Sequence, residues 1–279
     1  MGEVRGGGRD PRHEGTVALV TGAARGQGRA HCLRLAAEGA DILALDACTQ
    51  FDEVPYALPG PEELEETARL VRELGRRVVT AQVDVRDHDA MRAAVDDGVA
   101  ELGRLDSVVA NAGVCMVAPW DELTPETFRT TIDINLVGVW NTVTVAAPHV
   151  VRAGGGSIVL VSSVAGLKVQ PFMVNYTASK FAVTGMAKAF AVELAKDRVR
   201  VNSIHPTGVE TPMGQGVITD QIGHAIERNQ RPGVMFMNMM DVEVITPGDV
   251  ADTVSFLLSD ESRYITAQAL PVDAGNTSF

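Results

Sequence analysis

Short apolar runs alternate with longer amphipathic stretches from Thr16 onward. Seven of the apolar runs have the length of strands, and they cover about Val17–Thr21, Asp41–Asp46, Arg77–Val83, Ser107–Ala110, Ser157–Val161, Arg200–Ile204 and Gln268–Val272. Most of their positions are apolar, which is typical of parallel strands buried on both faces. The pattern predicts an α/β fold: one doubly wound parallel sheet of about seven strands with helices on both faces.

Residues at helical spacing fill most gaps between these runs. We expect helices at about Gly28–Glu38, Glu62–Leu74, after Asp84 to Leu102, from Thr124 to Arg152, around Tyr176 and Lys180, and before the last strand. Thr124, Pro125 and Glu126 form a typical helix start, because they supply a cap, a first-position proline and an acid in the first turn.

Three segments interrupt this alternation. Residues 1–14 contain four glycines and a proline, so we expect a flexible leader followed by a single domain over residues 15–279. Residues 47–61 form an insertion loop after the second strand, and loops of that length are usually functional. Residues 209–241 are rich in methionine and precede the last helix.

Composition narrows the possible functions. The chain has 279 residues, of which 46% are hydrophobic and 22% charged, as in ordinary globular proteins. The net charge of −12 argues against nucleic acid, which needs a basic face. Apolar runs are far shorter than the roughly 20 residues of a membrane span, and no signal segment is visible. We therefore expect a cytoplasmic protein without membrane contact.

The three cysteines, Cys32, Cys48 and Cys115, are odd in number and lack metal-ligand spacing. A disulfide framework or a metal site is therefore not expected. We interpret them as small buried apolar residues.

Tyr176 and Lys180 lie one helical turn apart in the segment VNYTASK. A neighbouring ammonium favours a phenolate, so Lys180 is expected to lower the pKa of Tyr176 and make it a base. The hydroxyl of Ser163, which follows the fifth strand, could hold a substrate oxygen while its charge changes. Taken alone, the pair could also be an ordinary surface pair of residues on a helix.

The turn after the first strand reads TGAARGQG and includes Gly22, Gly26 and Gly28. Glycines let the backbone approach a diphosphate, and the following helix start supplies N–H donors, although a tight turn without a ligand has the same composition. Asp46 ends the second strand, where an acidic side chain accepts hydrogen bonds from the adenosine ribose. The sequence thus favours NAD; Arg25 is a contrary signal, since a basic residue there could favour NADP.

Together these residues resemble the short-chain dehydrogenase/reductase family from Gly15 to Gly275, which implies a Rossmann-type domain. Asn135, Ser163, Tyr176 and Lys180 match the catalytic tetrad of that family in order and spacing. The resemblance implies cofactor contacts at Gly22, Arg25, Gly26, Gln27, Gly28, Asp46, Asp84, Val85, Asn111, Ala112, Gly113, Tyr176, Lys180, Pro206, Val209 and Thr211. Pro206–Thr207 replaces the usual Pro-Gly, so the path near Val209 and Thr211 is expected to differ.

More narrowly, the segments GAARGQGRAH and IHPTGVETPM and the insertion after Asp46 look like the carveol-dehydrogenase-like, mycofactocin-associated branch. That resemblance implies deeply buried NAD, partly covered by the insertion, with mycofactocin as a possible electron acceptor, and a homotetramer. It also implies that residues 209–241 form the substrate lid. Their methionines suggest a lipophilic secondary alcohol or ketone, terpenoid- or steroid-like, although they could equally pack an interface or core.

Three functions are compatible with this pattern. The first is an NAD-dependent alcohol dehydrogenase or reductase. The second is an NADP-dependent ketoreductase, which Arg25 supports and Asp46 opposes. The third is an NAD-binding redox sensor without turnover, which would not need the complete tetrad.

Overall fold

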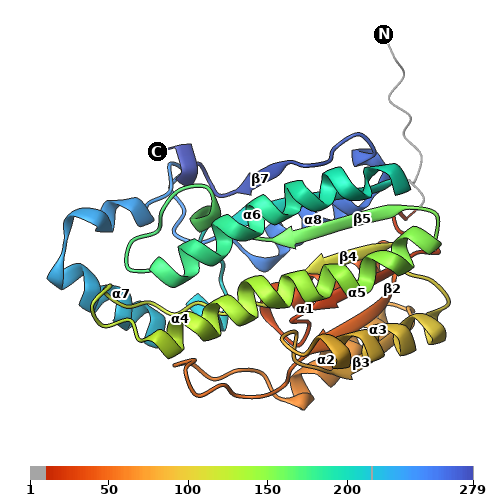
Figure 1. The fold of residues 1–279 in the computed structure, drawn as a ribbon, viewed down its shortest axis with the longest axis horizontal. Helices are drawn as coiled ribbons and strands as arrows, with labels where there is room; N and C mark the ends of the chain where they lie inside the picture. Colours follow the sequence, from red (N-terminus) through yellow and green to blue (C-terminus); the bar gives the residue numbers. More distant parts are fainter. Residues whose placement is uncertain (1–10, 215, 279) are drawn as a thin grey trace, which may run out of the picture.

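The computed structural model describes residues 11–214 and 216–278, and within them one parallel sheet organises the chain (Figure 1). Its seven strands lie in the order β3-β2-β1-β4-β5-β6-β7, so the order reverses between β1 and β4. The strands are β1 (Val17–Thr21), β2 (Asp41–Asp46), β3 (Val78–Gln82), β4 (Ser107–Ala110), β5 (Gly156–Val161), β6 (Val199–Pro206) and β7 (Ala269–Val272). The predicted doubly wound sheet is confirmed.

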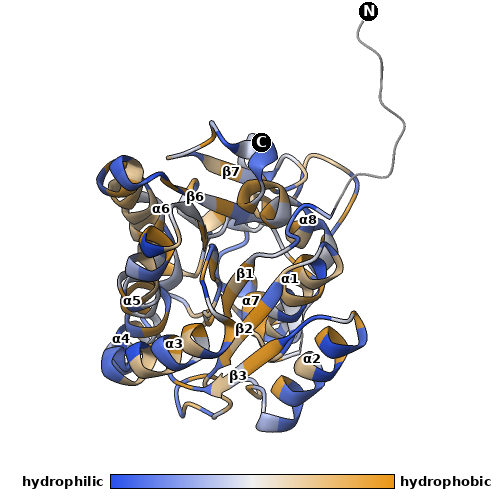
Figure 2. Cartoon of the chain, turned by 90° about the vertical axis from the view of Figure 1, so that its right-hand side faces the viewer, coloured by the Kyte–Doolittle hydropathy of each residue, from blue (hydrophilic) through white to orange (hydrophobic). Residues whose placement is uncertain are grey.

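Helices cover both faces of this sheet (Figure 2). The main helices are α1 (Gly26–Ala37), α2 (Pro61–Glu73), α3 (His88–Leu102), α4 (Pro125–Ile132), α5 (Gly138–Arg152), α6 (Val174–Leu194), α7 (Val217–Arg228) and α8 (Pro247–Leu258). In Figure 2, α1, α2 and α8 lie on one side of the sheet and α3 to α6 on the other.

Alternate residues of the strands build two cores, one on each face. Leu19 and Leu43 are fully buried in the first core, whereas Val20 and Ile42 are fully buried in the second. Because successive strand residues point to opposite faces, a sheet covered on both sides needs apolar residues at every position. This is the physical reason for the unbroken apolar runs in the sequence.

The structure refines several element boundaries. The long helical region after Thr124 is divided, because a π-helical turn at Asp133–Val137 separates α4 from α5. Thr124 caps α4 through Thr127 N, as predicted. The methionine-rich segment contains an unpredicted helix, α7.

The packed part of the chain begins before Gly15. Residues 1–10 of the predicted leader lie outside the described residues, but His13 is buried. Its ring Nε2 lies 3.0 Å from Ser255 Oγ on α8. Its backbone N–H donates to the carbonyl of Glu38, directly after α1. The four residues 11–14 therefore belong to the folded domain.

The helical run Pro125–Arg152 is long and apolar enough to cross a membrane by length and composition alone. However, 61% of its apolar window is buried inside the protein, as expected for a helix that packs on a central sheet. All three cysteines are free thiols; Cys32 and Cys115 are buried as predicted, but Cys48 is partly exposed. Among the described residues, no group of His, Cys, Asp or Glu could hold a metal ion.

Candidate active site

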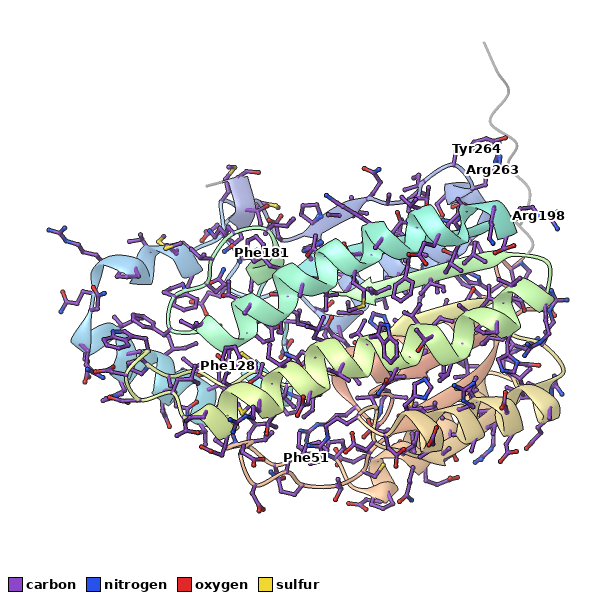
Figure 3. The ribbon with its side chains drawn as sticks, in the orientation of Figure 1. Phe51, Phe128, Phe181, Arg198, Arg263 and Tyr264 are labelled. Atoms are coloured by element: carbon purple, nitrogen blue, oxygen red, sulfur yellow. The ribbon has the colours of Figure 1, made fainter. Side chains whose placement is uncertain are left out.

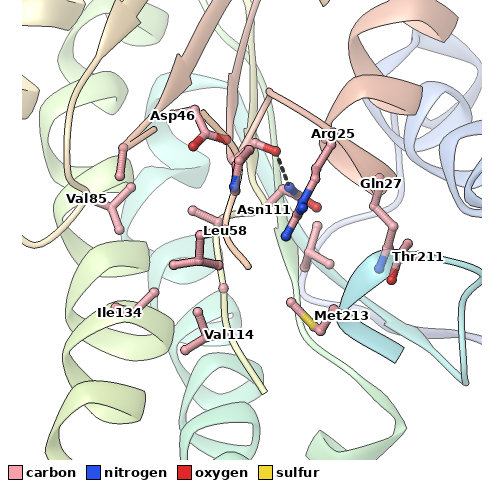
Figure 4. A pocket seen from close by; sticks show the side chains of 18 of the residues that line it. Arg25, Gln27, Asp46, Leu58, Val85, Asn111, Val114, Ile134, Thr211 and Met213 are labelled. Atoms are coloured by element: carbon pink, nitrogen blue, oxygen red, sulfur yellow. Dashed lines mark hydrogen bonds between the residues drawn. The ribbon is translucent and has the colours of Figure 1, made fainter. Parts of the chain in front are cut away.

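A cleft opens at the carboxyl ends of the strands, where doubly wound sheets bind ligands. It has an empty volume of about 1080 Å³, including space open to solvent (Figure 4). Most predicted cofactor contacts line it: Gly22, Arg25, Gly26, Gln27, Gly28, Asp46, Asp84, Val85, Asn111, Ala112, Gly113, Tyr176, Lys180 and Thr211. Pro206 and Val209 do not line it; Val209 instead pairs with Ile245 in an isolated bridge.

The glycine-rich turn between β1 and α1 brings backbone to the cleft. Gly22 has φ +68° and Gly26 has φ +54°, a region that side chains disfavour. A Cβ atom on Gly28 would lie 1.9 Å from the carbonyl oxygen of Gly22, so only glycine fits there. No side chain caps the start of α1, which leaves its first N–H groups for an anion such as a diphosphate.

Asp46 is held by backbone donors at the end of β2. Its Oδ2 accepts from Ala24 N and its Oδ1 from Cys48 N, each at 3.0 Å. Burial raises the pKa of Asp46, while these two N–H donors act to lower it. The carboxylate keeps further acceptor sites for ribose hydroxyls.

Arg25 is occupied by protein groups. Its guanidinium donates to the carbonyl of Ala57 and lies 3.9 Å from the Glu63 carboxylate. It therefore has partners of its own and is not a free cation waiting for a 2′-phosphate. Arg25 therefore no longer argues for NADP over NAD as the cofactor.

The far end of the cleft joins Asp84 to the insertion loop. Arg86 pairs with Asp84, with Nη2 at 2.6 Å from Oδ2, and its guanidinium carbon lies 4.2 Å from the centre of the Phe51 ring. Asn141 Nδ2 donates to Val85 O at 2.8 Å. Arg86 and Phe51 were not predicted, since nothing in the sequence linked a loop phenylalanine to this arginine.

Asn111 ties the loop after β4 to the end of β1. Its Nδ2 donates to Thr21 O at 2.9 Å, while Thr21 Oγ1 accepts from Asn111 N and Ala112 N. A Cβ on Gly113 would lie 3.2 Å from Asn135 Oδ1. The Asn-Ala-Gly segment therefore forms a close-packed wall between the two halves of the cleft.

Tyr176 and Lys180 line the other end of the cleft, whereas the predicted residues Ser163 and Asn135 are not among its lining residues. Lys180 Nζ lies 5.4 Å from the centre of the Tyr176 ring and donates to Val161 O at 2.9 Å. Ser163 lies two residues after β5, and its hydroxyl is close enough to the Tyr176 phenol to act on the pKa of Tyr176 and lower it. The three side chains predicted from sequence are thus brought together by β5 and α6.

The expected lowering of the pKa of Tyr176 is contradicted. Burial raises the pKa of Tyr176, with Cys115 and Tyr56 acting in the same direction and the Ser163 hydrogen bond opposing them. Burial also lowers the pKa of Lys180, to about 8. Helical spacing alone did not reveal that the ammonium is itself destabilised by the same apolar surroundings.

Asn135 lies in the π-helical turn and is fully buried. Its Oδ1 accepts from Val114 N and its Nδ2 donates to Val114 O, each at 2.8 Å. Its Nδ2 also donates to Ser179 Oγ at 3.3 Å. Such widened turns occur often at functional sites. Asn135 therefore holds the loop that faces Lys180, while its predicted water contact stays a prediction.

His205 is a site residue that the sequence reasoning missed. It is fully buried on β6, where its Nδ1 lies 2.8 Å from Ser163 O and its Nε2 lies 2.9 Å from Ser203 Oγ. Burial lowers the pKa of His205 to about 4, so the ring is neutral and fixes the backbone of Ser163. The sequence feature that could have pointed to His205 is a histidine at the end of the sixth predicted strand.

The insertion loop, residues 47–61, lies along the cleft, and we call it the strap. Thr49, Phe51, Tyr56, Leu58 and Pro59 of the strap line the cleft. Gln50 organises its backbone: Nε2 donates to the carbonyls of Val54 and Tyr56, and Oε1 accepts from Leu58 N at 2.9 Å. The loop was predicted to be functional, but none of these residues was singled out.

The methionine-rich segment is only partly a wall of the cleft. Met213 lines it, whereas Met237, Met239 and Met240 are more than half exposed. Met240 N donates to Ala274 O near the C-terminus. The methionines therefore do not form one apolar surface.

Helix α7 of this segment is fastened to the loop before α4. Arg228 pairs with Asp121 at 2.8 Å and with Glu122, and His224 lies 3.3 Å from Glu122. These side chains are all substantially exposed, so each pair contributes little alone.

A family model described as short chain dehydrogenase matches residues 16–222. The chain belongs to the short-chain dehydrogenase family. It is 44% identical over 273 residues to (-)-trans-carveol dehydrogenase of Rhodococcus erythropolis, covering 95% of this chain and 99% of that protein.

Two solved structures resemble this short-chain dehydrogenase over 96% of its length and all of theirs. One is a short chain dehydrogenase from Mycobacterium paratuberculosis bound to NAD, with TM-score 0.95 and 54% identity. The other is carveol dehydrogenase from Mycobacterium avium in complex with NAD, with TM-score 0.91 and 46% identity. This short-chain dehydrogenase is accordingly an NAD-dependent oxidoreductase.

The cleft of this short-chain dehydrogenase fits NAD. Gly22 and Gly28 lie against each other and line the cleft, so no side chain fills the space for a diphosphate beside the start of α1. Asp46 supplies a carboxylate for ribose hydroxyls. Gln27 also lines the cleft, and its buried Oε1 has no hydrogen-bond partner among the described residues. A dinucleotide laid along these groups would extend from Asp84 toward Tyr176.

Proposed function

We propose that this enzyme transfers hydride between a secondary alcohol or ketone and NAD, with Asn135, Ser163, Tyr176 and Lys180 as its catalytic tetrad. One observation carries the proposal: Tyr176 and Lys180 line the same cleft as the glycine-rich turn and Asp46. A non-catalytic sensor would not need this combination. The direct test is mass spectrometry of the denatured protein for carried NAD, followed by turnover of a panel of alcohols.

In alcohol oxidation, bound NAD supplies the hydride acceptor and the protein moves the proton. Tyr176 as phenolate takes the hydroxyl proton, while the Ser163 hydroxyl donates a hydrogen bond to the same substrate oxygen. Lys180 stabilises the phenolate and binds ribose hydroxyls; Asn135 positions a water that links Lys180 to solvent. His205 fixes the backbone of Ser163. Acid–base catalysis of this kind accelerates reactions about 10²- to 10⁴-fold.

A lipophilic secondary alcohol or ketone, terpenoid- or steroid-like, is the proposed substrate. Val114 and Met213 line the cleft near Tyr176, and Met116 and Met173 are buried close by. The name of the Rhodococcus relative, a dehydrogenase of the terpenoid carveol, supports the same class. Residues 209–241, with α7, are proposed as the substrate lid.

Oxidation should become faster as the pH rises. Because burial raises the pKa of Tyr176, little phenolate exists at neutral pH, and its fraction grows with each added pH unit. We expect kcat/KM for oxidation to rise from about pH 6 to 9, and ketone reduction, which uses the phenol as acid, to stay nearly level there because the phenol remains protonated. Steady-state profiles in both directions check this; an oxidation optimum below neutral pH would contradict it.

Replacing Asp46 tests the preference for NAD. Asp46→Asn removes the charge that repels a 2′-phosphate, and its single amide oxygen can accept from only one of the two donors, Ala24 N or Cys48 N. Comparing the two cofactors in the same variant cancels that loss. We expect the ratio of kcat/KM for NAD over NADP to fall about 10- to 100-fold. Asp52→Asn, on an exposed position of the strap, is the matched control. An unchanged ratio in Asp46→Asn would refute the role of Asp46.

Three further properties are proposed from resemblance. NAD stays bound between turnovers, with mycofactocin as electron acceptor; the strap residues along the cleft support tight retention. The enzyme is a cytoplasmic homotetramer. Exposed apolar side chains on the outer helices support an interface there, including Phe128 on α4 and Phe181 on α6, labelled in Figure 3.

A further inference from the structure

Tyr56 is a strap residue whose ring is buried in the cleft. It is only 8% exposed and lines the cleft together with Tyr176 and Lys180. Its hydroxyl oxygen accepts a hydrogen bond from Cys115 N at 3.1 Å. By contrast, Tyr264 is 89% exposed.

The Tyr56 hydroxyl has an unused hydrogen. Within residues 11–214 and 216–278, the structure gives it the bond from Cys115 N and no acceptor for its own proton. Burial raises the pKa of Tyr56, so the group stays a protonated donor at neutral pH. Because Tyr56 lines the cleft, a molecule bound in the cleft can supply the acceptor for this hydrogen.

The neighbours of Tyr56 show which part of a ligand it would meet. On one side, the carbonyl of Ala57 accepts from Arg25, which belongs to the glycine-rich turn. On the other side, Cys115, which donates its N–H to the Tyr56 hydroxyl, follows the Asn111–Gly113 wall, and Tyr176 lines the same cleft. The hydroxyl therefore lies between the diphosphate-binding turn and the catalytic tyrosine.

The backbone of Tyr56 is held independently of its ring. Gln50 Nε2 donates to the carbonyl of Tyr56 at 3.3 Å, and Gln50 Oε1 accepts from Leu58 N. Removing only the hydroxyl oxygen should thus leave the strap in place.

We propose that the Tyr56 hydroxyl donates a hydrogen bond to an oxygen of the diphosphate or of the attached ribose in the nicotinamide half of NAD. Tyr56 is then a cofactor-binding residue that the strap supplies. This inference rests on the assignment of NAD to the cleft, but not on any particular substrate.

Nucleotide fragments separate this role from a merely structural one. Affinities of Tyr56→Phe, of wild type and of the control Tyr264→Phe are measured by calorimetry on protein freed of bound nucleotide. We expect Tyr56→Phe to bind NAD and ADP-ribose about 10- to 100-fold more weakly, and AMP as tightly as wild type. If ADP is also bound more weakly, the acceptor is on the diphosphate; if only ADP-ribose and NAD are affected, it is on the ribose.

Other results would overturn the proposal. Unchanged NAD affinity in Tyr56→Phe rules out the hydrogen bond, and an equal loss for AMP shows that Tyr56 only supports the fold. A higher KM for the alcohol with unchanged NAD affinity would assign the hydroxyl to the substrate instead. Wild-type protein that binds NAD yet oxidises no alcohol would refute the proposed reaction while leaving the result on Tyr56 intact.

Discussion

Tyr176→Phe is expected to lower kcat for alcohol oxidation about 10²- to 10⁴-fold. The substitution removes one oxygen, the proton acceptor that we propose on α6. The ring and its packing are preserved, so bound NAD should be retained in wild-type amount. Steady-state kinetics and mass spectrometry of the denatured variant measure the two effects on the same preparation.

The contrast between the two readouts makes this experiment decisive. Loss of turnover together with loss of NAD would mean that the variant damages the cleft and not the proton transfer. Turnover within a few-fold of wild type would remove Tyr176 from the mechanism altogether. Ser163→Ala should show a smaller loss, because it removes a hydrogen-bond donor but not the base.

Gly28→Ala is expected to abolish measurable NAD binding. The new Cβ would lie 1.9 Å from the Gly22 carbonyl oxygen, and that neighbour is backbone which cannot rotate away. To relieve the clash, the first turn of α1 must move away from Gly22. This movement displaces the N–H groups at the start of α1, where we expect the diphosphate of NAD to bind. We expect at least a 100-fold weaker Kd for NAD, measured by calorimetry, and a melting temperature that NAD no longer raises.

Gly185→Ala provides the matched control. Gly185 lies on the exposed side of α6, and a Cβ there would meet nothing within 4 Å. Gly185 is not among the cleft-lining residues and lies one turn from Phe181, on the face proposed as an interface. This variant is therefore judged by NAD affinity alone, which should equal that of wild type. If Gly28→Ala and Gly185→Ala bind NAD with equal affinity, the turn between Gly22 and Gly28 does not hold the diphosphate of NAD.

The positions of most site residues followed from where the strands end. Gly22, Asp46, Asn111 and Ser163 each come at the end of an apolar run or within two residues of it, and parallel strands bring such residues to one edge. This argument needed only the local pattern. It could not place Val209, because the path of the chain after β6 depends on a bridge between Val209 and Ile245. Pro206 ends β6 but does not line the cleft.

Long-range contacts explain what the sequence did not reveal. Tyr56 meets Cys115, and Arg25 meets Ala57, through a loop whose shape depends on the single side chain of Gln50. The pKa of Tyr176 depends on how deeply its surroundings bury it, which helical spacing cannot express. Sequence patterns report periodicity, whereas these effects arise from contacts between distant segments.

The π-helical turn at Asp133–Val137 sets the rotational phase of α4 relative to α5. Such a turn accommodates one residue more than regular α-helix does, and one residue corresponds to about 100° of rotation. Asn175 Nδ2 donates to Thr131 Oγ1 at 2.8 Å. Loss of a single residue in the turn would rotate Thr131 away from Asn175 and break this hydrogen bond. Asn175 directly precedes Tyr176, so deleting one residue of the π-helical turn, about 40 positions earlier in the chain, would loosen the anchor of the Tyr176 side chain, to which we assign the proton transfer.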